Sequence, residues 1–212
     1  MKKLIFVFIL AQSFVFASWD MAISNAMISL KSYYTYDVAN YKKSLLEVIK
    51  QSEEAILNPK NGDFIVNLPK KSSEILKNAD KNGRLNDKFS EILNLVFKQN
   101  VTFISQTLQK AISSMSNEQA IKIMNGELLS KYLKNLTYLK LNTTFKNSIK
   151  NITKKPEYKH TLMLANKSKS GFENYLVDDF LNELFEFLQN NEKDFINDPF
   201  GFSANKVVNL KK

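Results

Sequence analysis

The stretch that decides the fold is residues 86–112, NDKFSEILNLVFKQNVTFISQTLQKAI. Its apolar residues recur every three or four positions, which is the spacing of one face of an α-helix. Asn86 or Asp87 is suited to cap this helix, because a side-chain oxygen there can accept a hydrogen bond from a free backbone N–H group. We expect the helix to form the spine of the core through its apolar stripe of Phe89, Ile92, Leu93, Val96, Phe97, Val101, Ile104, Leu108 and Ile112.

Helical spacing continues on both sides of this stretch. The spacing of residues 19–57 predicts one long helix or two shorter ones. A separate helix is expected to begin at Pro69 and end at Gly83. Ser116 and Gln119 have the spacing of a capping box at the start of a short helix. We expect further helices at 128–145, 158–167 and 172–188, a loop at 147–155, and a last helical turn at 207–208.

The sequence therefore predicts an all-α fold, a single-domain helical bundle with long central helices and short connecting helices. Its core is expected to contain Phe97, Ile104, Leu108, Leu181, Leu184 and Phe185.

The N-terminus has the pattern of a secretory signal peptide. Lys2 and Lys3 precede an apolar run at residues 4–10, and the small residue Ala17 marks a cleavage site. The run is shorter than the roughly 20 residues that span a bilayer, so no transmembrane helix is expected in the mature chain. Since the short dilysine start looks bacterial, we expect a periplasmic protein. The expected organisation is a signal peptide at 1–17, an N-terminal amphipathic arm at 18–36 and a helical domain at 37–212.

Composition excludes several classes of chemistry. The chain has no cysteine and one histidine, which removes thiol catalysis, thiolate metal sites and motifs with two imidazoles. No cofactor is expected. The chain has 30 Lys and Arg against 21 Asp and Glu, for a formal charge of +9, but Arg84 is its one arginine. Nucleic-acid readers favour arginine, so no nucleic-acid partner is expected. We interpret the lysines as scattered for solubility, with anionic phospholipid headgroups as the functional alternative.

Two features are candidates for chemistry and have simpler explanations. Asp178, Asp179, Glu183 and Glu186 could hold a divalent cation or form an acid–base pair, but their position opposite an apolar stripe favours a solvated helix face. His160 stands in a mixed segment without a nucleophile or ligand pattern, which favours a surface position.

Three blocks resemble the bacterial domain-of-unknown-function family 4197. They are residues 62–69, which end in Leu-Pro before a helix, residues 115–126 followed by Tyr132, and the segment from Tyr175 to Asp198-Pro199. The resemblance implies an exported, all-helical protein and no established reaction. The chain departs from the family pattern at Leu133-Lys134, where the family has an aromatic residue and arginine, and at Glu183, where it usually has glycine.

Two functions remain open. The first is a non-catalytic module of the bacterial envelope, expected to be a monomer, that binds a partner protein or an anionic lipid surface. The second is a small-molecule-binding or hydrolytic domain with a pocket between helices, using Tyr132 or Tyr175 and the acidic helix. The lack of a catalytic pattern favours a protein that is not an enzyme. The candidate interaction residues are Trp19, Tyr33, Tyr34, Tyr36, Tyr132, Lys134 and Tyr175.

Overall fold

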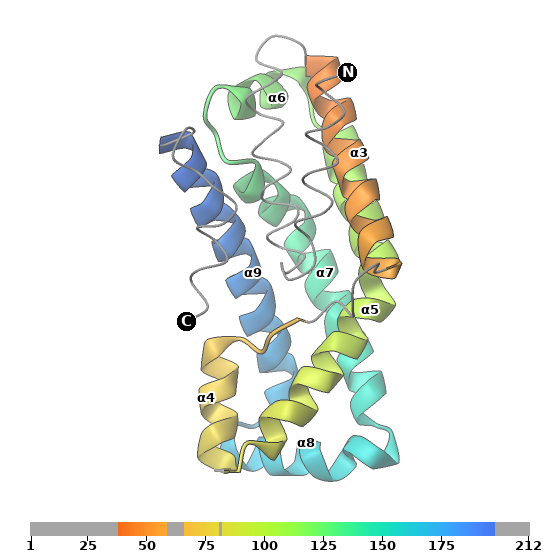
Figure 1. Cartoon of the computed structure of the whole chain (residues 1–212), viewed down its shortest axis with the longest axis vertical. Helices are drawn as coiled ribbons and strands as arrows, with labels where there is room; N and C mark the ends of the chain where they lie inside the picture. The colour runs from red at the N-terminus through yellow and green to blue at the C-terminus, as the bar shows by residue number, and fades with distance from the viewer. Residues whose placement is uncertain (1–37, 59–65, 81, 198–212) are drawn as a thin grey trace.

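The computed structural model describes residues 38–58, 66–80 and 82–197, and within these ranges the regular structure is entirely helical. The prediction of an all-α fold is confirmed. Figure 1 shows long helices running along the molecule, with α6 at one end and α8 crossing the other. The helices are α3 (Val38–Leu57), α4 (Lys70–Ala79), α5 (Arg84–Ser113), α6 (Asn117–Met124), α7 (Leu129–Thr153), α8 (Pro156–Ser168) and α9 (Phe172–Asn197).

Helix α5 is the spine, as its spacing predicts, and every member of its predicted stripe is buried. The predicted cap at Asn86 or Asp87 is wrong, because the N-cap residue lies three or four positions earlier. Gly83 is the N-cap residue, with a φ of 77° that glycine adopts without strain. The carboxylate of Asp80 accepts the backbone N–H of Leu85 at 3.2 Å, so a side chain outside the helix serves one of its free donors.

Three phenylalanines join the long helices at the centre of the core. Phe97 of α5 meets Phe145 of α7 and Phe180 of α9 edge to face, each at a centroid distance of 6.4 Å. Phe145 and Phe180 are stacked with centroids 5.9 Å apart. These are the geometries that aromatic pairs prefer, and they hold α5, α7 and α9 together as one layered core.

The predicted core set is correct except for Leu184. Phe97, Leu181 and Phe185 are buried with Ile104 and Leu108, whereas Leu184 is half-buried and packs on the core from its edge. Leu184 directly precedes the buried Phe185 and is about 100° from it around the helix, so it lies at the edge of the buried face.

The predicted loop at 147–155 is wrong for most of its length, because α7 continues without a break to Thr153. Ile149 and Ile152 continue the buried face that Phe145 begins, and all three are fully or almost fully buried. Packing of this face outweighs the weak helix propensity of the Asn- and Thr-rich sequence.

Shorter elements follow the prediction more closely. The Ser116 hydroxyl accepts the N–H of Gln119 at 3.0 Å, which confirms that capping interaction for α6. Helix α3 covers the described part of the predicted helix at 19–57. The rest of that prediction, the signal peptide, the amphipathic arm and the last turn at 207–208 lie outside the described residues.

Candidate functional site

The seven candidate interaction residues do not form one cluster in the described part of the chain. Trp19, Tyr33, Tyr34 and Tyr36 lie outside the described residues. Tyr132 and Lys134 are in the first two turns of α7, near α6, whereas Tyr175 is in the first turns of α9, near α8. The two tyrosines are therefore at opposite ends of the bundle (Figure 1).

Tyr132 and Lys134 both make contacts with neighbouring helices. The Tyr132 hydroxyl donates a hydrogen bond to the backbone carbonyl of Ala111 at 3.3 Å, joining the start of α7 to the end of α5. The Lys134 ammonium donates to the Asn182 amide oxygen at 3.3 Å, and it lies 5.5 Å from the ring centroid of Tyr138. Both side chains are half-buried and help to position α7.

Tyr175 is also half-buried and has a cation on its ring. The Lys169 ammonium lies 4.4 Å from the ring centroid, within the range of a cation–π interaction. Burial, followed by the charges of Asp179 and Glu74, raises the pKa of the Tyr175 hydroxyl. Because its pKa is raised, the Tyr175 hydroxyl stays protonated at neutral pH. Tyr175 is therefore poorly suited to act as a general base.

The acidic residues of α9 were expected on a solvated face, and the exposure of Glu183 and Glu186 agrees with this, whereas Asp178 and Asp179 are half-buried. Asp179 accepts hydrogen bonds from both the backbone N–H and the hydroxyl of Ser72, at 2.9 and 2.7 Å. Glu183 accepts the N–H of Lys70 at 3.2 Å. Both carboxylates therefore cap the N-terminus of α4, where free donors and the helix dipole favour negative charge.

Asp178 is engaged on the other side of α9. It forms an ion pair with Lys146 at 2.7 Å and accepts a hydrogen bond from the Asn142 amide at 2.6 Å, both from α7. Glu186 is exposed as expected. Among the described residues, no group of three or more acidic or histidine side chains is arranged to hold a metal ion.

Glu192 repeats the capping arrangement at the start of α7. Its carboxylate accepts the N–H groups of Leu129 and Ser130 at 2.8 and 3.0 Å and the Ser130 hydroxyl at 2.7 Å. The N-cap residue Leu128 has no side-chain acceptor, so α9 supplies the cap that the local sequence lacks. Glu192 is buried, as are the two residues that it caps.

The hydroxyl of Tyr41 in α3 is buried in the same region and has no hydrogen-bond partner. Burial, with a smaller contribution from the charge of Glu192, raises the pKa of this hydroxyl. An unpaired buried hydroxyl costs stability, so Tyr41 is a weak point of the fold.

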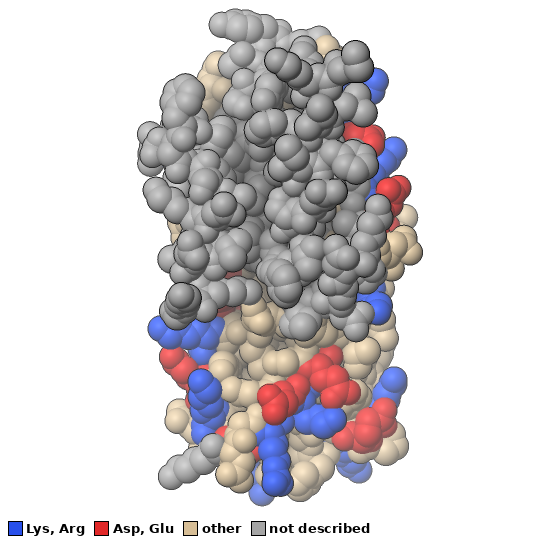
Figure 2. Space-filling view, viewed as in Figure 1, with Lys and Arg blue, Asp and Glu red and all other residues tan. Residues whose placement is uncertain are grey.

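The largest feature that the sequence analysis missed is the segregation of charge. Residues 92–156, from the third turn of α5 to the first residue of α8, contain ten lysines and two acidic residues. They therefore account for +8 of the formal charge of +9. Helix α7 has five lysines and no acidic residue. By contrast, Figure 2 shows basic and acidic residues intermingled on the lower part of the face that it presents.

Helices α5 and α7 lie side by side and antiparallel. Besides the Tyr132 contact, the Lys140 ammonium lies 5.0 Å from the ring centroid of Phe103, and the Asn100 amide donates to the Ser148 hydroxyl at 2.9 Å. Lys110 is seven residues from Phe103 and therefore on the same side of α5. Lys110 and Lys140 thus lie on the same side of this helix pair, whereas Lys134 and Lys146 of α7 contact α9.

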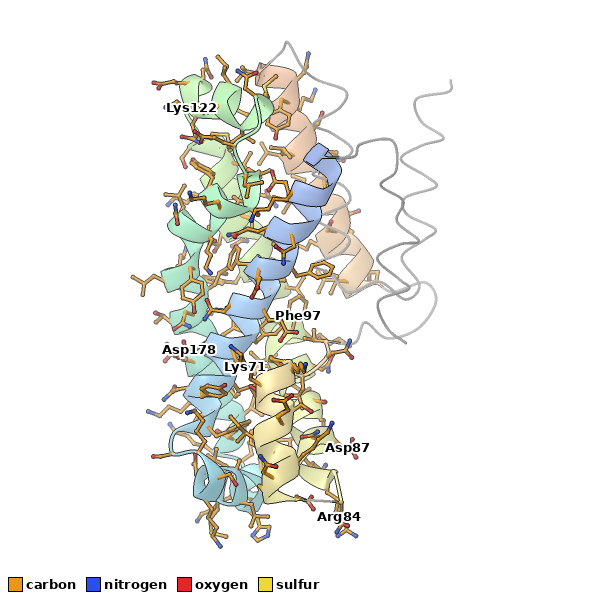
Figure 3. All side chains as sticks on the ribbon, turned by 90° about the vertical axis from the view of Figure 1, so that its left-hand side faces the viewer. Lys71, Arg84, Asp87, Phe97, Lys122 and Asp178 are labelled. Atoms are coloured by element: carbon orange, nitrogen blue, oxygen red, sulfur yellow. The ribbon has the colours of Figure 1, made fainter. Side chains whose placement is uncertain are left out.

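Two leucines stand among these lysines. Leu136 and Leu139 are 54% and 79% exposed. Figure 3 shows α7 along the left-hand edge of the bundle, with side chains projecting outward from it. We call this surface the basic face and define it by Leu136, Leu139, Lys140 and Lys150 on α7 and Lys110 on α5. The sequence does show this feature, because residues 128–156 contain no aspartate or glutamate. A net charge summed over the whole chain hides it.

None of the described helices is long and apolar enough to cross a membrane. The fold and its surface define an all-helical bundle protein with one segregated basic face. The chain belongs to the family described as Protein of unknown function (DUF4197), whose family model matches residues 46–205. This confirms the resemblance seen in the sequence. No curated protein and no solved structure gives a significant match to the chain.

Proposed function

We propose that the protein is a non-catalytic binding module of the bacterial cell envelope, and that its partner is anionic and docks on the basic face. The single observation that carries this proposal is that residues 92–156, which form most of α5 and all of α6 and α7, hold +8 of the formal charge, with Lys110, Lys140 and Lys150 exposed on the basic face. Clustered positive charge attracts anionic partners over about a Debye length, roughly 10 Å at 0.1 M salt.

The engagement of the acidic residues of α9 supports the proposal. Asp179, Glu183 and Glu192 cap helix N-termini, and Asp178 pairs with Lys146. Lys140 and Lys150 are exposed and lie on the outward side of α7. These two lysines are therefore available to an anionic partner.

The envelope location rests on the leader pattern at residues 1–17, which predicts export and cleavage after Ala17. N-terminal sequencing of the protein from a periplasmic fraction should give a chain that begins at Ser18. A full-length chain recovered from the cytoplasm would contradict the location.

Binding is tested with the mature chain and bacterial envelope membranes that retain their native proteins. We expect co-sedimentation at 0.1 M salt that weakens at 0.5 M. The double variant Lys140→Glu/Lys150→Glu should bind at least about twentyfold more weakly, since each lysine near an anionic surface contributes about 1 kcal/mol.

The control is Lys77→Glu/Lys159→Glu, which makes the same change in net charge at exposed positions on α4 and α8. It should bind nearly as the unmodified chain does. Equal loss in both double variants would show that net charge alone governs binding, and the assignment to the basic face would then be wrong.

A further inference from the structure

The basic face has a composition that distinguishes among anionic partners. We propose that its partner is the surface of an anionic lipid bilayer, with Leu136 and Leu139 entering the headgroup region between flanking lysines. This inference rests on the proposed function and names the partner of the same surface.

The first argument is the small size of the apolar part. A stable protein interface buries about 800 Å² on each partner around an apolar centre from which charged residues are depleted. On the outward side of α7 the exposed apolar residues are Leu136 and Leu139, with polar Asn135, Thr143 and Asn147 around them. Two leucines are too few for such a centre.

The second argument is the arrangement of charge and apolar side chains. Lys140 follows Leu139 directly, and Lys150 lies eleven residues after Leu139, about three turns along the same helix. A peripheral membrane site needs a few apolar side chains that reach the acyl boundary and positive charge spread around them. A rigid helix of 25 residues, about 37 Å long, presents both on its exposed side.

The third argument is the exposure of the leucines themselves. Leu139 is the most exposed of the large apolar residues in the described part of the chain, and Leu136 stands one turn before it. Met163 on α8 and Ile121 on α6 are also exposed but stand singly, as exposed apolar residues commonly do. The leucine pair within the basic face is therefore the candidate point of insertion.

The absence of cysteine from the chain permits a direct test. The variant Leu139→Cys is labelled with an environment-sensitive dye in the mature chain and mixed with vesicles of phosphatidylglycerol and phosphatidylcholine. We expect a blue shift of the dye emission with anionic vesicles and none with phosphatidylcholine alone. The control, Met163→Cys with the same dye, should bind the anionic vesicles equally and show no shift.

A second measurement uses flotation of unlabelled protein with the same vesicles. Leu136→Asn/Leu139→Asn should reduce binding at least tenfold, whereas Ile121→Asn/Met163→Asn should leave it nearly unchanged. Far-UV circular dichroism of each variant checks that the bundle is folded. Because all four substituted side chains are exposed, the substitutions should not unfold it.

The outcomes separate this inference from the proposed function. Binding to anionic vesicles without a shift at position 139 would place the membrane on another surface and overturn the inference. Binding to native envelope membranes that depends on Lys140 and Lys150, but with no binding to pure lipid, would identify an acidic envelope protein as the partner. That result would refute the lipid inference and leave the proposed function standing. If the protein binds neither native envelope membranes nor anionic vesicles, both the proposed function and the lipid inference are refuted.

Discussion

Glu192 is expected to be the most important polar side chain for the stability of the bundle. Replacing it by alanine removes the acceptor for the N–H groups of Leu129 and Ser130 and for the Ser130 hydroxyl. Leu129 and Ser130 are 1% and 2% exposed, so water cannot replace the carboxylate without opening the structure. The Glu192→Ala substitution therefore leaves buried hydrogen-bond donors without an acceptor at the start of α7.

The magnitude follows from the number of these donors. An unpaired buried donor costs about 1–3 kcal/mol, and at least the two backbone N–H groups lose their acceptor. We expect Glu192→Ala to lower the free energy of unfolding by about 2–6 kcal/mol. Glu192→Gln keeps an acceptor oxygen and loses the favourable interaction of negative charge with the helix N-terminus, so we expect about 1–2 kcal/mol.

The assay is urea unfolding followed by circular dichroism at 222 nm, with the slope checked for two-state behaviour. Glu186→Ala is the matched control, because Glu186 is an exposed carboxylate on the same helix. It should change the free energy by no more than about 0.5 kcal/mol. A loss below about 1 kcal/mol for Glu192→Ala would show that the α7 terminus does not depend on this carboxylate.

Three other predictions concern the core and two tyrosines. Tyr41→Phe should raise the free energy of unfolding by about 1 kcal/mol in urea, because it removes a buried hydroxyl without a partner; a loss would reveal a hydrogen bond to that group. Leu181→Ala should cost about 2–5 kcal/mol and Leu184→Ala clearly less, because the first side chain is buried and the second is half-buried; equal losses would contradict this difference. A hydrogen bond to Glu91, with burial second, raises the pKa of Tyr158 to about 12, so its contribution to stability should be present below pH 10 and lost as the pH rises towards 12. Absorbance titration at 295 nm should show that Tyr158→Phe lacks a transition near pH 12, and that Glu91→Gln shifts it to lower pH.

The hydrophobic spacing was sufficient to predict the class of fold and the central helix. Helical periodicity is a local property, and the stripe from Phe89 to Ile112 repeats it over many turns. The prediction of a loop at 147–155 failed at the end of α7. Ile149 and Ile152 are helical there because they are buried in the core, although the neighbouring residues do not favour a helix. The spacing also placed Leu184 in the core, where it is half-buried, because spacing shows a stripe without showing which part of it packs against another helix.

The capping carboxylates could not be predicted from local sequence. Asp179 and Ser72 are separated by 107 positions, and Glu192 and Ser130 by 62. A capping box is recognisable because both partners lie within one turn, as at Ser116 and Gln119. A cap supplied by another helix depends on how the helices pack. From the sequence of α9 alone, a capping carboxylate cannot be distinguished from any other charged surface residue.

This use of the acidic residues explains why one surface of the bundle is basic. Helix α9 carries seven acidic residues and one lysine, and it packs against α7, which carries five lysines and no acidic residue. If the carboxylates of α9 all faced these lysines, the two helices would neutralise each other. Asp178 does so with Lys146, but Asp179 and Glu192 are occupied by backbone donors of α4 and of the α7 terminus. Because their capping contacts hold Asp179 and Glu192 at helix ends and not beside Lys140 and Lys150, these two lysines on the outward side of α7 have no carboxylate among the described side chains of α9 directly paired with them. Substitutions at Glu192 should therefore change stability, while substitutions at Lys140 and Lys150 change binding.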